Sequence, residues 1–346
     1  MKKNTYKAIG LMSGTSCDGL DIVYCSFQYN GKWTFEILNT KIVEYSQDWI
    51  EKLRNAINLS KDELSLLDKE LGDYFGAETL QFIKDNYLKD IDFVASHGHT
   101  IFHKPEAGIT LQIGNGEAIK KIVKTIVIND FRSLDVANGG QGAPLVPVGD
   151  MLLFSQYDYC LNIGGIANVS YQENGIRKAY DVCFANMVLN PLANELELPY
   201  DKDGEIAKNG NLDTNLLNEL MNLNFQNKSL GFEIYEEYIL PLLEKYSISI
   251  ENKITTVTYY LALSIAKLFT PNTTVLITGG GAFNTFLISI LQKNTTAKIV
   301  KADIELIEFK EALIFAFLGM LKLENIPNCL SSVTGANKDI VGGVIV

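Results

Sequence analysis

The sequence lacks the features of a secreted or membrane-spanning protein. Its five cysteines are odd in number, scattered and never spaced C-x-x-C, so neither a disulfide framework nor a zinc knuckle is expected. The most apolar late stretch, 312–321, is too short to span a bilayer, and its charged flanks Glu311 and Lys322 suit a buried helix. The N-terminus has neither the apolar core nor the cleavage site of a signal peptide. These absences predict a cytoplasmic protein with reduced thiols.

Positive charge is also scarce. The chain has 30 basic and 41 acidic residues, a net charge of -11. Binding to nucleic acid is not expected, because coating a duplex needs a concentrated positive surface. An anionic ligand would have to be held by local backbone donors. With 346 residues, of which 47% are hydrophobic, the chain can bury a sizeable core. Two domains of about 150 residues each are the natural expectation.

Two common nucleotide-binding signatures are missing. The Walker loop G-x-x-x-x-G-K-[ST] does not occur, and no G-x-G-x-x-G follows the first predicted strand. The chain has instead a glycine-rich turn in two copies, G-L-M-S-G-T-S-C-D-G at 10–19 and L-N-I-G-G-I-A-N at 161–168. Each turn lies in a set of three predicted strands, at 8–12, 22–27 and 33–38 and again at 159–163, 166–171 and 176–180. The pairs Asn30-Gly31 and Asn174-Gly175 predict tight hairpin turns in these sets.

Outside these hairpins the pattern predicts alternating helices and strands, as in an α/β fold. Ser60 and Glu63 form a capping-box pair before a helix with the apolar stripe Leu64, Leu67, Leu71 and Phe75. Helices are also expected over 117–124, 186–196, 211–223 and 254–268, and strands over 93–95, 125–128 and 275–278. The glycine- and proline-rich segment 131–149 is predicted to lack regular structure at the domain junction. It is either a linker or a binding loop, because it mixes Arg132, Asp135 and Gln141 with closely spaced glycines.

The first glycine-rich turn has the composition of a phosphate-binding loop. Residues 13–16, S-G-T-S, can present backbone N–H groups and hydroxyls into one concavity. Asp18 and Asp21 cannot bind phosphate directly, because like charges repel. They either face Mg²⁺ or its water shell, or stabilise the turn. A further close approach of backbone to a ligand is expected at Gly279 to Gly281.

The histidines and one aspartate are further candidates for a site. His97, His99 and His103 all lie in one short segment. A metal site, a substrate-contacting loop and a surface turn are alternative interpretations, although no acidic or thiol ligand is close by in the sequence. Asp181 is expected at the end of the third strand of the second set, where open α/β proteins place their ligands. Its carboxylate either acts as a general base or caps the following helix.

Together these motifs resemble the anhydro-N-acetylmuramic acid kinase family, a member of the actin-like sugar kinase superfamily. The resemblance covers nearly the whole chain and rests on the segments 10–21, 96–100, 111–114, 129–147, 161–170, 278–284 and 333–336, in this order. It implies an α/β, two-domain actin-like ATPase (sugar kinase) fold with a duplicated β-sheet core and an interdomain cleft. The domains would be 1–135, with the C-terminal segment near 335–346 as an optional completion, and 136–334.

The resemblance also implies an activity in peptidoglycan recycling. The protein would open the anhydro bridge of 1,6-anhydro-N-acetylmuramic acid with water and phosphorylate its six-position oxygen, giving N-acetylmuramic acid 6-phosphate. Asp181 matches the aspartate that activates the water, and His97, Arg132 and Glu311 would contact the sugar. ATP and Mg²⁺ would be held by Ser13, Gly14, Thr15, Ser16, Cys17, Asp18, Gly19, Leu20, Asp21, Gly164, Gly165, Asn168, Gly279, Gly280 and Gly281, with Asp18 facing the metal through Mg-ATP.

The sequence departs from the family at three places. Residues 181–186 read D-V-C-F-A-N where D-T-G-P-G-N is expected, His99 stands where glutamine is usual, and 227–233 read N-K-S-L-G-F-E where P-K-S-T-G-R-E is usual. Cys183 and Ala185 in place of glycines limit how closely main chain can approach a ligand. Two other functions stay open: a kinase for another anhydro-sugar such as levoglucosan, and a non-catalytic nucleotide-binding sensor. The expected partner is a small amino sugar, with neither membrane nor nucleic acid, and a homodimer is left open.

Overall fold

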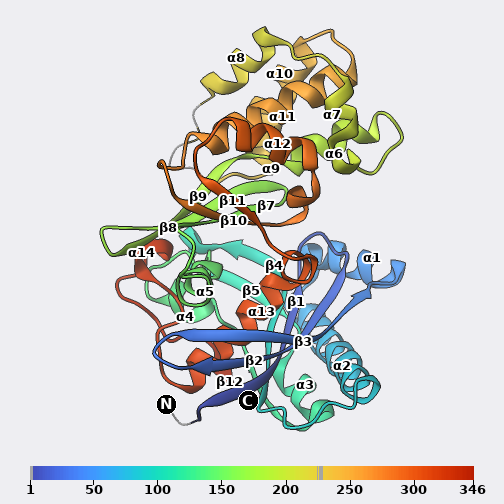
Figure 1. Ribbon diagram of the computed structural model, residues 1–346. Helices are drawn as coiled ribbons and strands as arrows, with labels where there is room; N and C mark the ends of the chain where they lie inside the picture. The colour runs from blue at the N-terminus through green and yellow to red at the C-terminus, as the bar shows by residue number, and fades with distance from the viewer. Residues whose placement is uncertain (1–2, 224, 226–228) are drawn as a thin grey trace. The chain divides into compact units, whose positions relative to one another are not determined.

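The computed structural model describes residues 3–223, 225 and 229–346. It is an α/β structure with two mixed sheets (Figure 1). The chain divides into two compact units: unit 1, Met1–Phe154 with Phe309–Val346, and unit 2, Ser155–Glu308. The predicted domains 1–135 and 136–334 are bounded differently from these units, and the domain boundary itself stays a prediction.

The sheet of unit 1 is built on the first predicted set of strands. β1 (Thr5–Ser13), β2 (Gly19–Tyr29) and β3 (Trp33–Glu44) form an antiparallel meander. β4 (Phe93–Lys104) pairs parallel to β1, β6 (Ile126–Asn129) pairs parallel to β4, and β12 (Val344–Ile345) adds antiparallel to β6. The order is β12-β6-β4-β1-β2-β3, and β5 (Ile109–Ile113) pairs with β4 off this path.

The sheet of unit 2 repeats this order. β7 (Tyr159–Ile163), β8 (Ile166–Glu173) and β9 (Ile176–Phe184) form the second antiparallel meander. β10 (Thr274–Thr278) pairs parallel to β7, and β11 (Lys298–Lys301) pairs parallel to β10. The order β11-β10-β7-β8-β9 therefore matches β6-β4-β1-β2-β3 strand for strand. The duplicated β-sheet core that the resemblance implies is confirmed.

The helices of unit 1 confirm one prediction and correct another. The capping box at the start of α2 (Lys61–Asp85) is formed, since Ser60 Oγ accepts from Glu63 N–H and the Glu63 carboxylate accepts from Ser60 N–H. The prediction that 131–149 lacks regular structure is wrong, because α4 (Ser133–Ala137) and α5 (Val146–Leu153) lie there. Pro147 is in the first turn of α5, where its missing N–H costs nothing. The other helices are α1 (Gln47–Asn55), η1 (Ala56–Asn58), η2 (Pro105–Ala107), α3 (Gly116–Val123) and α14 (Ser331–Thr334).

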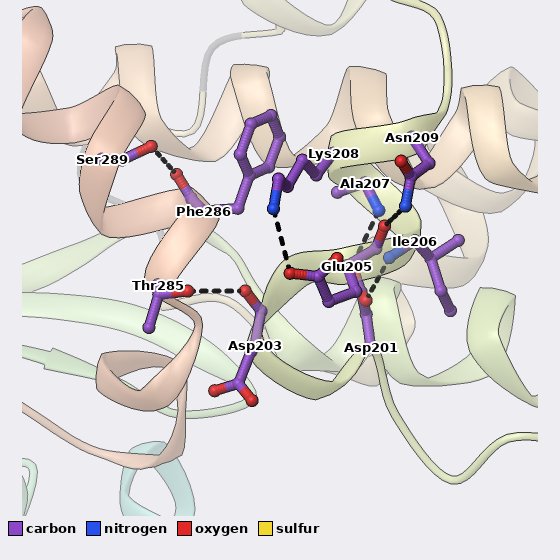
Figure 2. A network of polar contacts seen from close by, with 10 residues as sticks. All are labelled: Asp201, Asp203, Glu205, Ile206, Ala207, Lys208, Asn209, Thr285, Phe286 and Ser289. Carbon is purple, nitrogen blue, oxygen red and sulfur yellow. Dashed lines mark hydrogen bonds and ion pairs between the residues drawn. The ribbon is translucent and has the colours of Figure 1, made fainter.

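The helices of unit 2 include those predicted near 186–196, 211–223 and 254–268. They are α6 (Asn186–Asn194), η3 (Lys202–Gly204), α7 (Glu205–Asn209), α8 (Thr214–Asn222), α9 (Phe232–Ile234), the π-helix η4 (Tyr235–Ile239), α10 (Leu240–Lys245), α11 (Ile250–Ala266), η5 (Gly280–Phe283) and α12 (Thr285–Lys293). Figure 2 shows how the start of α7 is held: the Asp201 carboxylate accepts from the N–H groups of Ile206 (2.8 Å) and Ala207 (3.0 Å). Thr285 of α12 donates to the Asp203 carbonyl at 2.9 Å, which ties α12 to the η3 turn that precedes α7.

The predicted buried helix at 312–321 lies in the second half of α13 (Ile304–Leu323), which enters unit 1 at Phe309. Its residues from Ala312 to Leu318 are at most 1% exposed. All five cysteines are buried and lie outside disulfides. Within the described ranges, no helix is long and apolar enough to cross a membrane.

Candidate active site

The first glycine-rich turn joins β1 to β2 in unit 1. Ser13 ends β1, and the Cys17 N–H closes the turn by donating to the Gly14 carbonyl at 3.2 Å. Thr15, Ser16 and Asp18 are exposed, whereas Ser13 and Cys17 are buried. A ligand can therefore reach the middle of the turn and the Asp18 carboxylate, but not the Ser13 hydroxyl.

The remaining residues of this predicted cofactor segment lie in β2. A Cβ at Gly19 would come within 2.4 Å of the Val43 carbonyl oxygen, so the packing of β2 on β3 requires glycine there. The Leu20 side chain has 0% exposure and belongs to the core. Asp21 is partly buried and is the register partner of Met12 in β1. Gly19 and Leu20 thus have only backbone groups to offer a ligand.

The three predicted sugar contacts, His97, Arg132 and Glu311, lie together in unit 1. Arg132 Nε and Nη2 are 3.1 Å and 2.9 Å from His97 Nε2, and Arg132 Nη1 donates to the Gly142 carbonyl at 2.7 Å. Burial and the nearby Arg132 charge lower the pKa of His97 well below its usual range. The neutral ring therefore accepts at Nε2 and donates from Nδ1 to the Gly98 carbonyl, 2.9 Å away.

Glu311 provides the negative charge near this guanidinium. Its side chain is exposed to solvent, but the protein around it raises the pKa of the carboxyl by desolvation, against the lowering effect of Arg132 and Lys310. Desolvation lowers the pKa of Arg132, and Glu311 opposes that shift. The arrangement offers a cation and a carboxylate to a polar ligand. That the ligand is a sugar stays a prediction.

Asp135 holds the loop that supports Arg132. Its carboxylate is fully buried and accepts from the Gly142 N–H (2.8 Å) and from Thr334 Oγ1 (2.9 Å). A Cβ at Gly140 would lie 2.1 Å from Asp135 Oδ2, so the loop wraps closely around the carboxylate. The segment is thus packed inside unit 1 and is not a loose polar linker.

The second glycine-rich turn joins β7 to β8 in unit 2. The Gly165 carbonyl accepts from Ala185 (2.9 Å) and Met187 (3.0 Å), and the Gly164 carbonyl accepts from Asn186 (3.1 Å), so the turn holds the start of α6. Neither glycine has a positive φ, and a Cβ on either would meet no atom closer than 3.4 Å. The fold therefore does not require glycine at these two positions. Their lack of side chains leaves space beside the turn that a ligand can use.

The three glycines after β10 have different roles. Gly279 has φ 82°, and its Cβ would come within 2.7 Å of both Asn162 Oδ1 and the Ile163 carbonyl oxygen. A Cβ at Gly281 would come within 2.2 Å of Ile163 Cγ2. Both are required for packing on β7. Gly280 is exposed, and its Cβ would meet only Asn186 Nδ2 at 3.9 Å, so it is the glycine of this turn that is open to a ligand.

Asp181 lies inside β9 rather than at its end. A register shift between Ala167 and Asn168 pairs Asp181, rather than Val182, with Asn168, which is the effect of a β-bulge. Asp181 does not cap α6, because the N-cap is Ala185 and has no side-chain cap. Asp181 was predicted either to act as a general base or to cap α6, and the capping role is therefore wrong.

The register across the sheet aligns Asp181 with other polar residues. Asn168 is opposite Asp181, Asn162 is opposite Asn168, and Thr278 is opposite Asn162. Register partners in neighbouring strands share a face of the sheet. Asn162 was not among the predicted site residues, although it stands two positions before Gly164 in the repeated motif. Its amide lies between the glycine turns, since Oδ1 would be 2.7 Å from a Cβ at Gly279 and Nδ2 3.4 Å from one at Gly164.

The Asp181 carboxylate is partly buried and anchored on one side. Its Oδ2 accepts from the Leu230 N–H at 2.9 Å. Desolvation raises the pKa of Asp181, and the Leu230 hydrogen bond opposes the rise. Leu230 belongs to the segment 227–233, of which Asn227 and Lys228 lie outside the described residues. A carboxylate with a raised pKa and one anchored oxygen is suited to take a proton.

Three of the four residues that depart from the family motif after Asp181 are buried in the core, and the fourth, Val182, is partly buried. Cys183, Phe184 and Ala185 all have 0% exposure. Phe184 packs edge to face on Phe225, with ring centroids 5.6 Å apart. These side chains therefore affect a ligand only through the backbone that they position.

The three histidines do not converge on one point. His97 contacts Arg132, His99 Nδ1 contacts Ser13 Oγ at 2.9 Å, and His103 Nδ1 contacts Thr110 Oγ1 at 3.2 Å. In the part of the chain that the structure describes, no group of three or more His, Cys, Asp or Glu side chains is placed to hold a metal ion. Mg²⁺ that arrives with a nucleotide needs only one or two carboxylates in addition to phosphates and water. The exposed Asp18 beside the first turn fits that requirement.

Comparison with known proteins gives a family match over nearly the whole chain. The model of the family described as anhydro-N-acetylmuramic acid kinase matches residues 6–346. A protein named anhydro-N-acetylmuramic acid kinase from Bacillus thuringiensis subsp. konkukian (strain 97-27) is 33% identical, with 97% of this chain and 98% of the relative covered. One of the same name from Bacillus cereus (strain AH187) is 34% identical, with 96% and 97% covered.

Solved structures are more distant. Component A of (R)-2-hydroxyglutaryl-CoA dehydratase from Acidaminococcus fermentans has a TM-score of 0.46 at 14% identity, with 90% of this chain and 96% of that chain covered. The ROK hexokinase from Thermus thermophilus has a TM-score of 0.43 at 11% identity, with 91% and 99% covered.

Proposed function

Because the chain belongs to the anhydro-N-acetylmuramic acid kinase family, we propose that it phosphorylates anhydro-N-acetylmuramic acid with ATP as the phosphoryl donor. Water adds to the anomeric carbon, the bond from that carbon to the six-position oxygen breaks, and this oxygen takes the γ-phosphoryl group. The products are N-acetylmuramic acid 6-phosphate and ADP. The observation in the structure that supports this reaction most directly is the environment of Asp181.

Asp181 acts as the general base in this proposal. Only Oδ2 is engaged, by the Leu230 N–H, and Oδ1 has no partner within the described ranges. Oδ1 can orient a water molecule and take its proton as the water attacks the sugar. Burial keeps the pKa of Asp181 above that of an ordinary aspartate, which makes it a better proton acceptor while it is ionised.

ATP phosphates are held by backbone donors, since the chain has no Walker lysine. In unit 1 the donors are the N–H groups of the turn at Gly14, Thr15 and Ser16, with Asp18 toward the metal. In unit 2 the open positions are Gly164, Gly165 and Gly280, with Asn168 nearby. When bound, Mg-ATP would supply the phosphoryl group, and its Mg²⁺ would neutralise part of the phosphate charge. The residues of this chain align it and exclude competing water.

The sugar is bound through Arg132, His97 and Glu311. His97 and the Gly142 carbonyl fix the plane of the guanidinium, which keeps further N–H groups for an oxygen or carboxylate of the substrate. Glu311 can accept from a sugar hydroxyl. Because Arg132 is held by two partners, it is positioned before the sugar arrives.

A turnover assay tests the proposed function. The protein is incubated with ATP, Mg²⁺ and anhydro-N-acetylmuramic acid, and the products are followed by mass spectrometry. We expect ADP and N-acetylmuramic acid 6-phosphate in equal amounts. Absence of both products would contradict the proposal. Comparing kcat/KM for anhydro-N-acetylmuramic acid with that for levoglucosan tests the sugar specificity.

Cellular location and oligomeric state stay predictions. The five cysteines, which form no disulfide, favour a reducing compartment such as the cytoplasm. Cell fractionation tests the location, and light scattering on a sizing column tests the homodimer.

A further inference from the structure

Four buried polar side chains form a connected chain beneath the β1–β2 turn. Ser13 Oγ lies 2.7 Å from Tyr45 Oη and 2.9 Å from His99 Nδ1. On the other side of the ring, His99 Nε2 lies 3.9 Å from Cys17 Sγ, and Cys17 Sγ lies 3.7 Å from the Thr15 carbonyl oxygen. All four side chains are at most 6% exposed. We call Tyr45, Ser13, His99 and Cys17 the His99 relay.

The direction of the hydrogen bonds in the His99 relay is fixed at its Thr15 end. A carbonyl oxygen can only accept, so the Cys17 thiol donates to Thr15. The thiol sulfur then accepts from His99, which puts the ring hydrogen on Nε2. Nδ1 of the neutral ring is left as an acceptor for the Ser13 hydroxyl, and Ser13 Oγ accepts from Tyr45. In this direction each proton of the four side chains has an acceptor.

This direction determines how the peptide groups of the turn point. The Thr15 carbonyl faces inward to Cys17, and in a trans peptide the N–H of the next residue points the opposite way, so the Ser16 N–H faces outward. The Gly14 carbonyl accepts from the Cys17 N–H, so the Thr15 N–H also points away from the interior of the turn. Neither N–H has a partner among the residues that the structure describes. Adjacent outward N–H groups form a concavity for an anion.

We propose that His99 is a positioning residue, which orients the β1–β2 turn through Ser13 and Cys17 so that its N–H groups are ready for the phosphate oxygens of a nucleotide. This inference rests on the proposed function in that the anion is taken to be ATP. Burial lowers the pKa of His99 to about 4, so the neutral ring that the relay needs is the form present near pH 7. Tyr45 also acts through its backbone, since its N–H donates to the Asp18 carbonyl at 3.2 Å and holds the far end of the turn.

Three substitutions separate the hydrogen bonds of the His99 ring from its bulk. In His99→Gln, the residue usual in the family replaces the ring, and its amide can still accept from Ser13 and donate to Cys17. His99→Leu keeps a side chain of similar bulk but can do neither. His103→Leu removes an exposed histidine from the same strand, β4, and serves as the matched control.

The experiment is calorimetric titration of each variant with Mg-ATP and with adenosine, which lacks phosphates. We expect His99→Leu to weaken ATP binding about tenfold, the usual effect of leaving buried polar partners unpaired, with unchanged adenosine binding. His99→Gln should stay within about twofold of wild type, as should His103→Leu. Thermal unfolding shows whether each variant is folded; if His99→Leu is not, Ser13→Ala replaces it with the same expected loss.

Two results would overturn this inference. One is ATP binding by His99→Leu at wild-type affinity. The other is equal loss in His99→Gln and His99→Leu, because then the ring itself, and not its hydrogen bonds, would matter. These titrations contain no sugar. Their outcome can therefore be interpreted even if the protein does not phosphorylate the anhydro-sugar. Wild-type protein that binds no ATP would instead contradict the proposed function as well.

Discussion

Asp181 is the residue whose replacement separates catalysis from stability. Desolvation raises its pKa, so the folded protein favours the protonated form, and at pH 7 the ionised carboxylate costs stability. Asp181→Asn removes this charge but keeps an acceptor for the Leu230 N–H. We predict that kcat falls about 10²- to 10⁴-fold while the melting temperature at pH 7 rises. Steady-state assay of ADP release and thermal unfolding measure the two effects, and retained turnover would refute the base assignment.

Asp181 also determines how kcat/KM depends on pH. A general base works only when ionised, so kcat/KM should fall as the pH falls through the Asp181 pKa. Because that pKa is raised, the decline should begin at a higher pH than for an ordinary aspartate, which titrates at about 3.9. The measurement is the pH profile of kcat/KM, with circular dichroism confirming that the protein stays folded. A profile that is flat to pH 4 would argue against Asp181 as the base.

At the scale of single residues, the sequence predicted candidates but not the contacts that surround them. The motif named Asp181, Arg132 and the first glycine turn as candidates, and their place in the site stays a prediction. It did not reveal that Ser13 faces inward, since its partners Tyr45 and His99 are 32 and 86 residues away along the chain. Contacts over such separations leave no local pattern in one sequence.

At the scale of elements, two glycine turns of unit 2 allow a matched test of ligand binding against packing: the β7–β8 turn and the turn after β10. A Cβ at Gly164 meets no atom closer than 3.4 Å, whereas one at Gly281 lies 2.2 Å from Ile163 Cγ2. We predict that Gly164→Ala leaves the melting temperature near wild type but weakens ATP binding, because the methyl group occupies space proposed for phosphate. Gly281→Ala should destabilise the fold by about 1–3 kcal/mol through overpacking. Denaturant unfolding and calorimetry separate the two; a stable Gly164→Ala with unchanged ATP affinity would count against the phosphate assignment.

The loop after α4 allows a second test at this scale. Asp135→Ala removes both acceptors, so the Gly142 N–H loses its partner and the Thr334 hydroxyl keeps only the Leu330 carbonyl at 3.3 Å. We predict a loss of about 1–3 kcal/mol in the free energy of unfolding and a higher KM for the sugar, because Gly142 supports Arg132. The affinity for ATP should not change. A variant that loses affinity for ATP as much as for the sugar would contradict this assignment.

Elements were predictable where their signals are local. Asn-Gly pairs and the Ser60–Glu63 capping box gave the hairpins and the start of α2. Composition did not predict the short helices α4 and α5, because glycine and proline usually interrupt helices, whereas Pro147 lies in a first turn that tolerates it. The bulge beside Val182 was also missed, since its cause is the pairing of β9 with β8 and not a residue type.

For the whole molecule, the predicted α/β fold class with a duplicated sheet is confirmed by the strand order repeated in the two sheets, and the predicted family is confirmed by the match over residues 6–346. The interdomain cleft depends on the placement of the two units and stays a prediction. A net charge of -11 makes backbone N–H groups the natural phosphate ligands, as composition alone had indicated. What composition and topology do not determine is the reaction itself.

Turnover in H₂¹⁸O tests the central claim most directly. With ATP, Mg²⁺ and anhydro-N-acetylmuramic acid, the attacking water should leave one ¹⁸O on the anomeric carbon of N-acetylmuramic acid 6-phosphate and none in its phosphate group, because the phosphorylated oxygen comes from the sugar. Mass spectrometry of the intact product and its fragments reads both positions. Release of ¹⁸O-labelled inorganic phosphate without a phosphosugar would show ATP hydrolysis alone and would contradict the account.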